Sequence, residues 1–116
     1  MTASEPSPVY VGTSGWAYKV WQPTFYPPKL AQTNYLRHYA TRLNTVEVNY
    51  TFRHLLTEKT INNWLQQTPE NFKFVIKANQ RITHIKRLKD VDDALGAFVS
   101  SVSPLERSGR LGPVLF

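Results

Sequence analysis

The sequence predicts an α/β fold with parallel strands, a partial TIM (β/α)8-type barrel. A short apolar run that ends in polar residues is followed by a helical stretch three times, at residues 9–15, 45–49 and 72–77. A fourth apolar run occupies residues 112–116. Alternating strands and helices are typical of a parallel sheet. Because a whole barrel has about 250 residues, the 116 residues predict about three and a half βα units, truncated at the fourth strand.

The composition indicates one globular domain, since 41% of the residues are hydrophobic and 19% are charged, as is usual for folded proteins. Without an apolar run of about 18 residues, we expect no membrane segment. Residues 1–8 are polar and proline-rich and do not resemble a secretory signal, so we expect a disordered tail on a cytoplasmic protein. The absence of cysteine fits that compartment. Residues 9–116 then form the domain.

Fourteen Lys and Arg against eight Asp and Glu give a net charge of +6, which favours anionic partners through long-range attraction. Alternatively, the rest of a complete barrel carries compensating acids, and the charge says nothing about partners.

The first half of the chain has two strands, each followed by a helix. The first strand is expected at residues 9–13, and the long aromatic and proline-rich segment 16–28 after it is typical of a ligand-binding loop. A helix over 33–43 follows from one apolar face, and a second strand at 45–49 precedes a helix capped by Thr57 and ended by Pro69. The inward residues of these two helices are Leu36, Tyr39, Ala40 and Leu43, then Ile61, Trp64 and Leu65.

The second half repeats the pattern. The third strand, 72–77, alternates and puts Phe74 and Ile76 on one side and Lys77 on the other. A basic loop, 78–89, leads to a helix with Asp90 as its N-cap, closed by Pro104. Residues 108–110 turn the chain into the last strand, 112–116. The expected buried stripe of the helix is Val91, Leu95, Phe98, Val99 and Val102.

Charged and amide side chains at the strand ends are the candidate catalytic group. Val46 and Val48 alternate with Glu47 and Asn49, so if the valines meet the helices, the latter two point into the barrel mouth. Lys77 should point inward one strand away. A carboxylate and an ammonium there can handle protons, with Glu47 as acid or base and Lys77 stabilising an anion. The alternative is an ion pair that only stabilises the barrel interior.

The turn Gly12-Thr13-Ser14-Gly15 matches neither the Gly-x-Ser-x-Gly hydrolase elbow nor a phosphate-binding P-loop. We instead expect the Thr13 and Ser14 hydroxyls, with free amides, to bind an oxyanion or a hydroxyl group. From the aromatic loop, Trp16 and Tyr18 are the expected ligand contacts; their alternative role is to plug the barrel top.

The loop after the third strand leaves a strand's carboxyl end, so its basic residues should face the ligand and hold phosphate or carboxylate groups. Its candidates are Arg81, Thr83 and His84, beside Lys86, Arg87 and Lys89. The alternative is a solvated loop neutralised by nearby aspartates. His38, His54 and His84 lack the paired spacing of a metal site, so we assign no metal, and the sequence names no cofactor.

Several blocks of the sequence resemble the YecE-like family, also known as domain of unknown function 72. The blocks are Val11-Gly12-Thr13-Ser14-Gly15-Trp16 with Tyr18, Phe25-Tyr26-Pro27, Thr45-Val46-Glu47-Val48-Asn49 with Thr51-Phe52, Phe72-Lys73-Phe74 with Lys77, Arg81-Ile82-Thr83-His84 and Leu111-Gly112-Pro113-Val114-Leu115-Phe116. The resemblance implies a TIM-type barrel related to sugar isomerases, of which residues 9–116 are the N-terminal half. It implies no established reaction.

The sequence thus favours a protein that binds a small polar ligand, anionic or sugar-like, at its strand ends, with isomerase- or hydrolase-type acid/base chemistry as the reaction it would support. One alternative is a nucleic-acid-binding module that uses the basic loop 81–89 for phosphates and the aromatic loop 16–26 for stacking. Another is a fragment without activity of its own. The sequence leaves open whether the protein is an enzyme and what its oligomeric state is.

Overall fold

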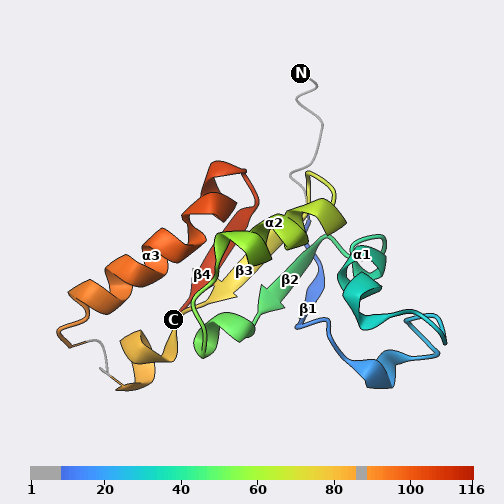
Figure 1. Ribbon diagram of the computed structural model, residues 1–116, viewed down its shortest axis with the longest axis horizontal. Coiled ribbons are helices and arrows are strands. Elements are labelled where there is room, and N and C mark those ends of the chain that lie inside the picture. Colours follow the sequence, from blue (N-terminus) through green and yellow to red (C-terminus); the bar gives the residue numbers. More distant parts are fainter. Residues whose placement is uncertain (1–8, 86–88) are drawn as a thin grey trace.

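A single parallel sheet is the centre of the fold. The computed structural model describes residues 9–85 and 89–116, and within them four strands pair in the order in which they occur along the chain (Figure 1). The α/β fold with parallel strands is therefore confirmed, as an open sheet. The strands are β1 (Gly12–Ser14), β2 (Thr45–Val48), β3 (Lys73–Lys77) and β4 (Leu111–Leu115).

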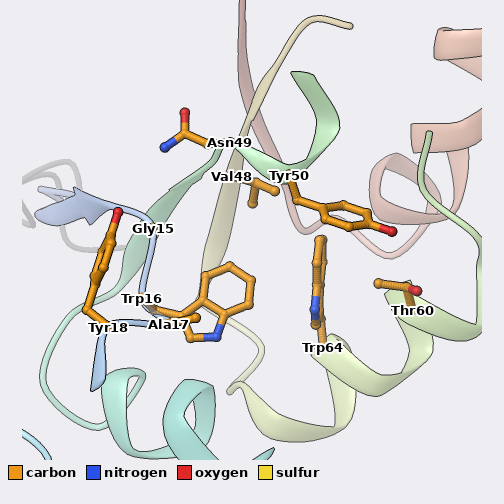
Figure 2. A pocket seen from close by; sticks show the side chains of 9 residues that line it. All are labelled: Gly15, Trp16, Ala17, Tyr18, Val48, Asn49, Tyr50, Thr60 and Trp64. Carbon is orange, nitrogen blue, oxygen red and sulfur yellow. The ribbon is translucent and has the colours of Figure 1, made fainter. Parts of the chain in front are cut away.

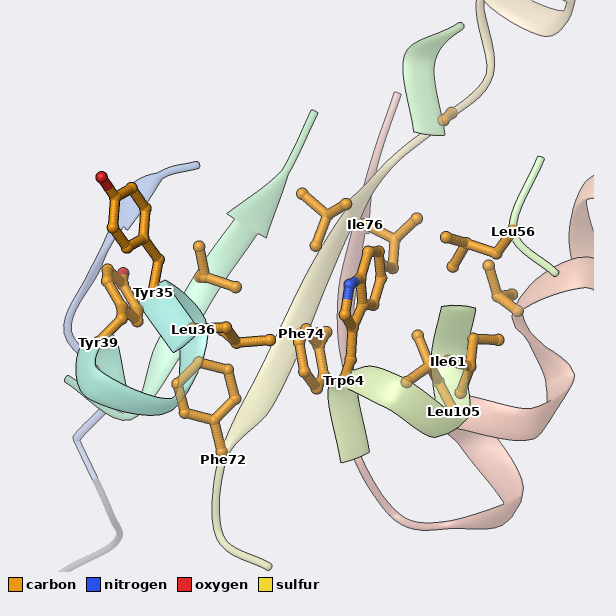
Figure 3. Close-up of a cluster of buried hydrophobic side chains, with 14 of the residues drawn as sticks. Tyr35, Leu36, Tyr39, Leu56, Ile61, Trp64, Phe72, Phe74, Ile76 and Leu105 are labelled. Atoms are coloured by element: carbon orange, nitrogen blue, oxygen red, sulfur yellow. The ribbon is translucent and has the colours of Figure 1, made fainter. Parts of the chain in front are cut away.

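Helices follow the first three strands and pack on one face of the sheet. They are α1 (Tyr35–Tyr39), α2 (Glu58–Gln67) and α3 (Asp92–Arg107), and their buried side chains form one cluster with those of β2 and β3 (Figure 3). Three 3-10 turns, Lys19–Trp21, Gln32–Asn34 and Tyr50–Phe52, and a π-helical turn, Arg81–Ile85, complete the described elements. None of the described helices has the length and apolar character needed to cross a bilayer.

Alternation in the two central strands determines which face is covered. Val46 and Val48 of β2 are 0% and 1% exposed, and Phe74 and Ile76 of β3 are fully buried under the helices. Glu47 and the residues two positions before and after it, Thr45 and Asn49, are only half-buried. The expected division of β2 and β3 into an apolar and a polar face is thus confirmed. We call the face opposite the helices the uncovered face.

The first strand begins later than predicted. Val9 and Val11 are exposed, and the Asn44 side chain bonds their backbone: its Oδ1 accepts from Val11 N at 2.8 Å and its Nδ2 donates to Val9 O at 2.7 Å. An amide side chain therefore replaces a strand partner here. At Gly12 the strands approach so closely that a Cβ would lie 1.9 Å from Thr45 O.

Helices α1 and α2 follow the sequence prediction, although α1 is shorter. Leu36 and Tyr39 are buried as expected, while the remainder of the predicted span 33–43 forms turns. Thr57 caps α2, since its side chain accepts a hydrogen bond from Thr60 N at 3.2 Å, and this bond satisfies an otherwise free N–H of the first turn. Thr68 ends the helix just before Pro69.

Helix α3 differs from the prediction at both ends. Its N-cap is Val91, and Asp90, expected in that role, has a left-handed backbone with φ of 48°. The helix also continues through Pro104 to Arg107. Leu105 is 0% exposed, and the free energy of burying it offsets the backbone hydrogen bond that proline removes.

The buried stripe of α3 is partly different as well. Phe98 and Val102 are buried as expected, but Val99 is half exposed, and Leu105 beyond the proline contributes to the core instead. Gly109, with φ of 73°, then turns the chain toward β4, as the sequence predicted for residues 108–110. The expected tail, residues 1–8, lies outside the described residues.

A buried guanidinium joins the carboxyl end of α2 to the amino ends of β3 and β4. Arg110 is 7% exposed, its Nε donates to Phe72 O at 2.9 Å, and its guanidinium also bonds Thr68 Oγ1. Burial lowers the pKa of Arg110, and the Glu70 carboxylate opposes that shift. The charge is thus tolerated because its donors have partners inside the protein.

We predict that Gly12→Ala destabilises the protein by about 1–3 kcal/mol, because the new methyl group collides with the Thr45 backbone and forces the two strands apart. The matched control is Gly96→Ala in α3, where a Cβ meets nothing within 4 Å and alanine should stabilise the helix by about 1 kcal/mol. Urea denaturation followed by circular dichroism measures both. Equal stability of the two variants would contradict the close approach of β1 and β2.

We also expect Arg110→Met to lower the free energy of unfolding by about 2–3 kcal/mol, since it leaves Phe72 O and Thr68 Oγ1 without their charged donor. Arg107→Met, at an exposed position in the last turn of α3, should change it by less than about 0.5 kcal/mol. The same denaturation measurement compares the two, and a similar loss in both would show that the buried hydrogen bonds contribute nothing.

Candidate functional site

The turn after β1 brings its polar residues to the end of β2. Gly15 has φ of 80°, a conformation that favours glycine, and its N–H donates to Glu47 O at 2.9 Å. A Cβ at Gly15 would also lie 2.7 Å from the Tyr18 hydroxyl. Ser14 pairs in register with Glu47, and the chain then leaves the sheet.

Ser14 and Asn49 are in direct contact. Asn49 Nδ2 donates to Ser14 Oγ at 2.5 Å, which joins the end of β1 to the residue that follows β2. Ser14, Glu47 and Asn49 therefore lie together at the carboxyl ends of two adjacent strands, as the alternation of β2 predicted. Thr13, the other hydroxyl of the turn, is separate from them, since it pairs in register with Val46 of the buried face.

The Thr13 hydroxyl has an internal partner. Its Oγ1 donates to Gly15 O at 2.7 Å, and its backbone N–H donates to the hydroxyl of Tyr39 at 2.8 Å. That hydroxyl donates in turn to Thr45 O at 2.8 Å. Tyr39 of α1 thus joins β1 to β2 from the face of the sheet that the helices cover. Thr13 takes part in this internal hydrogen bonding, and its side chain does not lie beside that of Ser14.

Lys77 lies at the end of β3, on the uncovered face. Glu47 pairs in register with Val75, so Lys77 is one strand over and two residues further along. Strand spacing and rise place the Cα atoms of Glu47 and Lys77 roughly 8 Å apart. The Lys77 ammonium lies over the ring of Phe52, with Nζ 4.7 Å from the ring centroid, an attractive cation–π contact.

Two buried polar side chains hold the loops that follow β2 and β3. Thr51, 1% exposed, donates from Oγ1 to Lys77 O at 2.7 Å and approaches Val48 O at 3.2 Å. Asn79, 5% exposed, donates to Thr51 O at 3.2 Å and accepts from Arg81 N at 3.0 Å. Both were missed as site residues in the sequence, although Thr51 belongs to one of the family-like blocks.

The π-helical turn carries the basic candidates beyond β3. Thr83 Oγ1 and His84 Nδ1 are 2.8 Å apart, and the His84 ring meets Phe52 edge to face at 4.9 Å. His84 is therefore linked to Lys77 through Phe52. Arg81 is exposed on the same turn. Lys86 and Arg87, which the sequence added to this basic group, lie outside the described residues.

The aromatic loop after β1 mostly packs inward. Tyr26 is fully buried and donates to Trp16 O at 2.5 Å, and burial, reinforced by Tyr39 and Tyr35, raises the pKa of its hydroxyl. Tyr18 remains 41% exposed and donates to Ser14 O at 2.6 Å. Trp16 and Tyr18, the two expected ligand contacts, thus both lie beside the end of β1.

A pocket of about 450 Å³ opens between this loop and α2 (Figure 2). Trp16 and Trp64 meet edge to face in it, with ring centroids 5.4 Å apart. Sequence reasoning assigned Trp64 to the core only, and its i, i+3 spacing from Ile61 gave no sign of a second role. The lining residues are Gly15, Trp16, Ala17, Tyr18, Val48, Asn49, Tyr50, Thr60 and Trp64.

Metal ligands do not converge in the part of the chain that the structure describes: no group of three or more His, Cys, Asp or Glu side chains is close enough to hold an ion. What the site offers instead is a carboxylate, an ammonium, a hydroxyl and an amide. These groups can hydrogen-bond a polar ligand and transfer protons to or from it.

Comparison with known proteins supports the resemblance seen in the sequence. Residues 10–116 match the family model described as "Protein of unknown function DUF72". The chain belongs to the DUF72 family. It is 30% identical over 112 residues to the UPF0759 protein YunF of Bacillus subtilis (strain 168), covering 93% of this chain and 39% of YunF. It is 31% identical over 97 residues to the UPF0759 protein YecE of Escherichia coli (strain K12), covering 84% of this chain and 33% of YecE.

Solved structures of DUF72 proteins share the fold. A crystal structure from Thermotoga maritima MSB8 matches with a TM-score of 0.77 and 29% identity, over 90% of this chain and 42% of that one. Another, from Enterococcus faecalis V583, matches with a TM-score of 0.69 and 23% identity, over 88% of this chain and 36% of that one. The DUF72 chain described here therefore spans between 33% and 42% of the length of these relatives.

We predict that Thr51→Val lowers the free energy of unfolding by about 1–3 kcal/mol, because it keeps the side-chain shape but removes the donor to Lys77 O. Thr24→Val, at an exposed position, is the matched control and should be nearly neutral. Hydrogen exchange followed by NMR should also show faster exchange of the Ala78 amide in Thr51→Val, while the amides of α1 keep their rates. Unchanged exchange beside β3 would mean that Thr51 does not hold this loop.

Proposed function

We propose that this DUF72 protein binds a small polar ligand, anionic or sugar-like, at the carboxyl ends of its parallel strands. Glu47 acts as general acid or base, and Lys77 stabilises a negative charge on the ligand. Ser14 and Asn49 hydrogen-bond the ligand. His84, with Arg81 and Thr83 on the same turn, approaches its anionic part from the side of β3.

One observation carries the proposal: four polar side chains from three separate segments of the sequence lie at the same end of three adjacent strands. Ser14 pairs with Glu47 and bonds Asn49, and Lys77 ends the next strand. In α/β sheets, ligands bind outside the carboxyl ends of the strands. The same four side chains at the amino ends of the strands would not support a ligand site, because ligands do not bind at that edge of such sheets.

The position of the Lys77 ammonium over Phe52 favours action on a ligand over a direct ion pair with Glu47. Their Cα atoms are roughly 8 Å apart, and because the ammonium is held over Phe52, a small molecule at the strand ends can contact both charges. The carboxylate then meets one side of the ligand and the ammonium the other. This arrangement suits acid/base chemistry of the isomerase or hydrolase type, in which a proton moves while a negative charge develops.

The fold proposal follows from the same face. We assign residues 9–116 to the N-terminal half of a TIM-type barrel, with the uncovered face as its interior. The size of the DUF72 relatives supports this assignment, because they are more than twice as long as this chain. A barrel also closes the sheet and buries that face. If the other half is required to complete the site, this chain by itself has no activity.

The nucleic-acid alternative has less support. Stacking on bases needs exposed aromatic faces, whereas Tyr26 is fully buried and Trp16, Trp21 and Phe25 pack against the core. Among the described aromatic side chains of this loop, Tyr18 alone is exposed. The net charge of +6 remains the main argument for a polyanionic partner.

We expect Lys77→Met to weaken binding of ribose 5-phosphate about tenfold, because it removes one charge-assisted contact to the phosphate. Glu47→Gln should weaken binding of the neutral probes glucose and ribose, since the amide replaces a strong acceptor of their hydroxyl protons. Isothermal titration of this chain measures both effects. The corresponding positions of full-length YunF serve as a second test, in which the whole fold is present.

The matched control is Lys73→Met, on the same strand and face, where the ammonium bonds Gly109 O near the amino end of β3. It should leave ribose 5-phosphate binding within about twofold of the unchanged protein. Equal losses in the Lys73 and Lys77 variants would remove the strand-end site. Tight binding of single-stranded DNA that disappears with added salt, without any response to sugars, would favour the nucleic-acid alternative.

A further inference from the structure

The aromatic pocket beside the end of β2 is separate from the polar face and differs from it in chemistry. Val48, which points toward the helices, forms part of its wall, whereas Glu47 and Lys77 lie on the other face of the sheet. We propose that this pocket binds an uncharged carbohydrate ring. The inference deepens the proposed function and rests on it in one respect, namely that the ring belongs to the same ligand that reaches the strand ends.

The walls of the pocket are rigid aromatic surfaces. The rings of Trp16 and Trp64 are nearly perpendicular, at 88°, and Figure 2 shows them side by side below Tyr50. Trp64 stacks on Phe74 of the core with ring centroids 5.5 Å apart. The Tyr26 hydroxyl bonds the carbonyl of Trp16. Trp64 is itself only 7% exposed and serves as the support. The C–H face of a pyranose can pack on the partly exposed ring of Trp16, which does not have to be ordered upon binding.

The rim supplies hydrogen-bonding groups without charge. Thr60 Oγ1 accepts a bond from Thr57 Oγ1 at 3.0 Å, which leaves its own proton to donate. Asn49 uses Nδ2 for Ser14, so its Oδ1 can accept from a ligand hydroxyl. The Tyr50 hydroxyl is on a side chain that is 51% exposed. Donors and acceptors around an aromatic floor match the hydroxyls around a sugar ring.

The lining explains why the ring must be neutral. Among the described residues, no Asp, Glu, Lys or Arg lines the pocket, so a phosphate placed there would lose water without gaining a cation. At about 450 Å³ the pocket falls within the range of small-molecule sites, about 300–1,000 Å³. A purely apolar ligand such as indole would fit the walls but leave the rim groups without partners.

Asn49 connects the pocket to the polar face. It lines the pocket while its amide bonds Ser14 at the carboxyl end of β1. A ligand whose ring occupies the pocket can therefore extend past Asn49 toward Ser14 and Glu47. The arrangement assigns ring recognition to Trp16, Tyr50 and Thr60 and leaves proton transfer to the other face of the sheet.

Titration with methyl β-D-glucopyranoside tests the inference, with tryptophan fluorescence and saturation-transfer NMR as readouts. The glucoside should bind this chain with a millimolar dissociation constant and should quench tryptophan emission. Tyr50→Ala should weaken binding about tenfold, and Thr60→Val, which keeps the side-chain shape, at least about threefold. Tyr10→Ala, at another exposed tyrosine outside the pocket, should have no effect. Trp64 is left unchanged because it packs in the core.

Two results would overturn the inference. One is that the glucoside does not bind at all, and the other is that indole displaces it and binds Thr60→Val as well as the unchanged protein. Glu47→Gln and Lys77→Met separate this inference from the proposed function. If neither variant alters the binding of ribose 5-phosphate while Tyr50→Ala still weakens glucoside binding about tenfold, the polar-face proposal fails and the ring site stands.

Discussion

Burial of Val46 and Val48 determines the register of β2, and the rest of the strand-end arrangement depends on it. Both valines are almost fully buried beneath the helices, and side chains alternate strictly along a strand, so a slip by one residue would place Glu47 in the core and a valine in water. The cost of burying that carboxylate excludes the slipped pairing. Apolar packing on one face therefore fixes the polar groups on the other, and β1 and β3 inherit this register through their pairing with β2.

Hydrogen bonds from three interior side chains then hold the connections around the strand ends. Tyr39 joins β1 to β2, Thr51 joins the end of β2 to the end of β3, and Asn79 joins Thr51 to the π-helical turn. Each satisfies backbone groups that short strands leave without sheet partners. The loops that carry Asn49, Phe52 and His84 are thus positioned by the scaffold, which favours a site formed before its ligand arrives.

Local sequence patterns correctly predicted the features that depend on a single helix or strand. Alternation in β2 and β3 predicted the shared face of Glu47, Asn49 and Lys77, and the Thr57 cap followed from residue type alone. The failures concern contacts between distant segments. Nothing near Pro104 indicates that burial of Leu105 carries α3 past it, and nothing near Thr13 or Trp16 reveals Tyr39 or Trp64 as partners. Such contacts depend on tertiary packing, which periodicity does not encode.

Under the proposed function, the contact between Lys77 and Phe52 sets a threshold for an anion that binds at the strand ends. An anion that draws the ammonium away from the ring forfeits a cation–π attraction of about 0.5–1 kcal/mol, a loss that a carboxylate or phosphate easily exceeds and that a weakly polar group does not. The same ring also meets His84, so displacement of the ammonium uncovers a face of Phe52 beside the imidazole. In that proposal, an uncharged residue determines how readily the ammonium is released to a ligand.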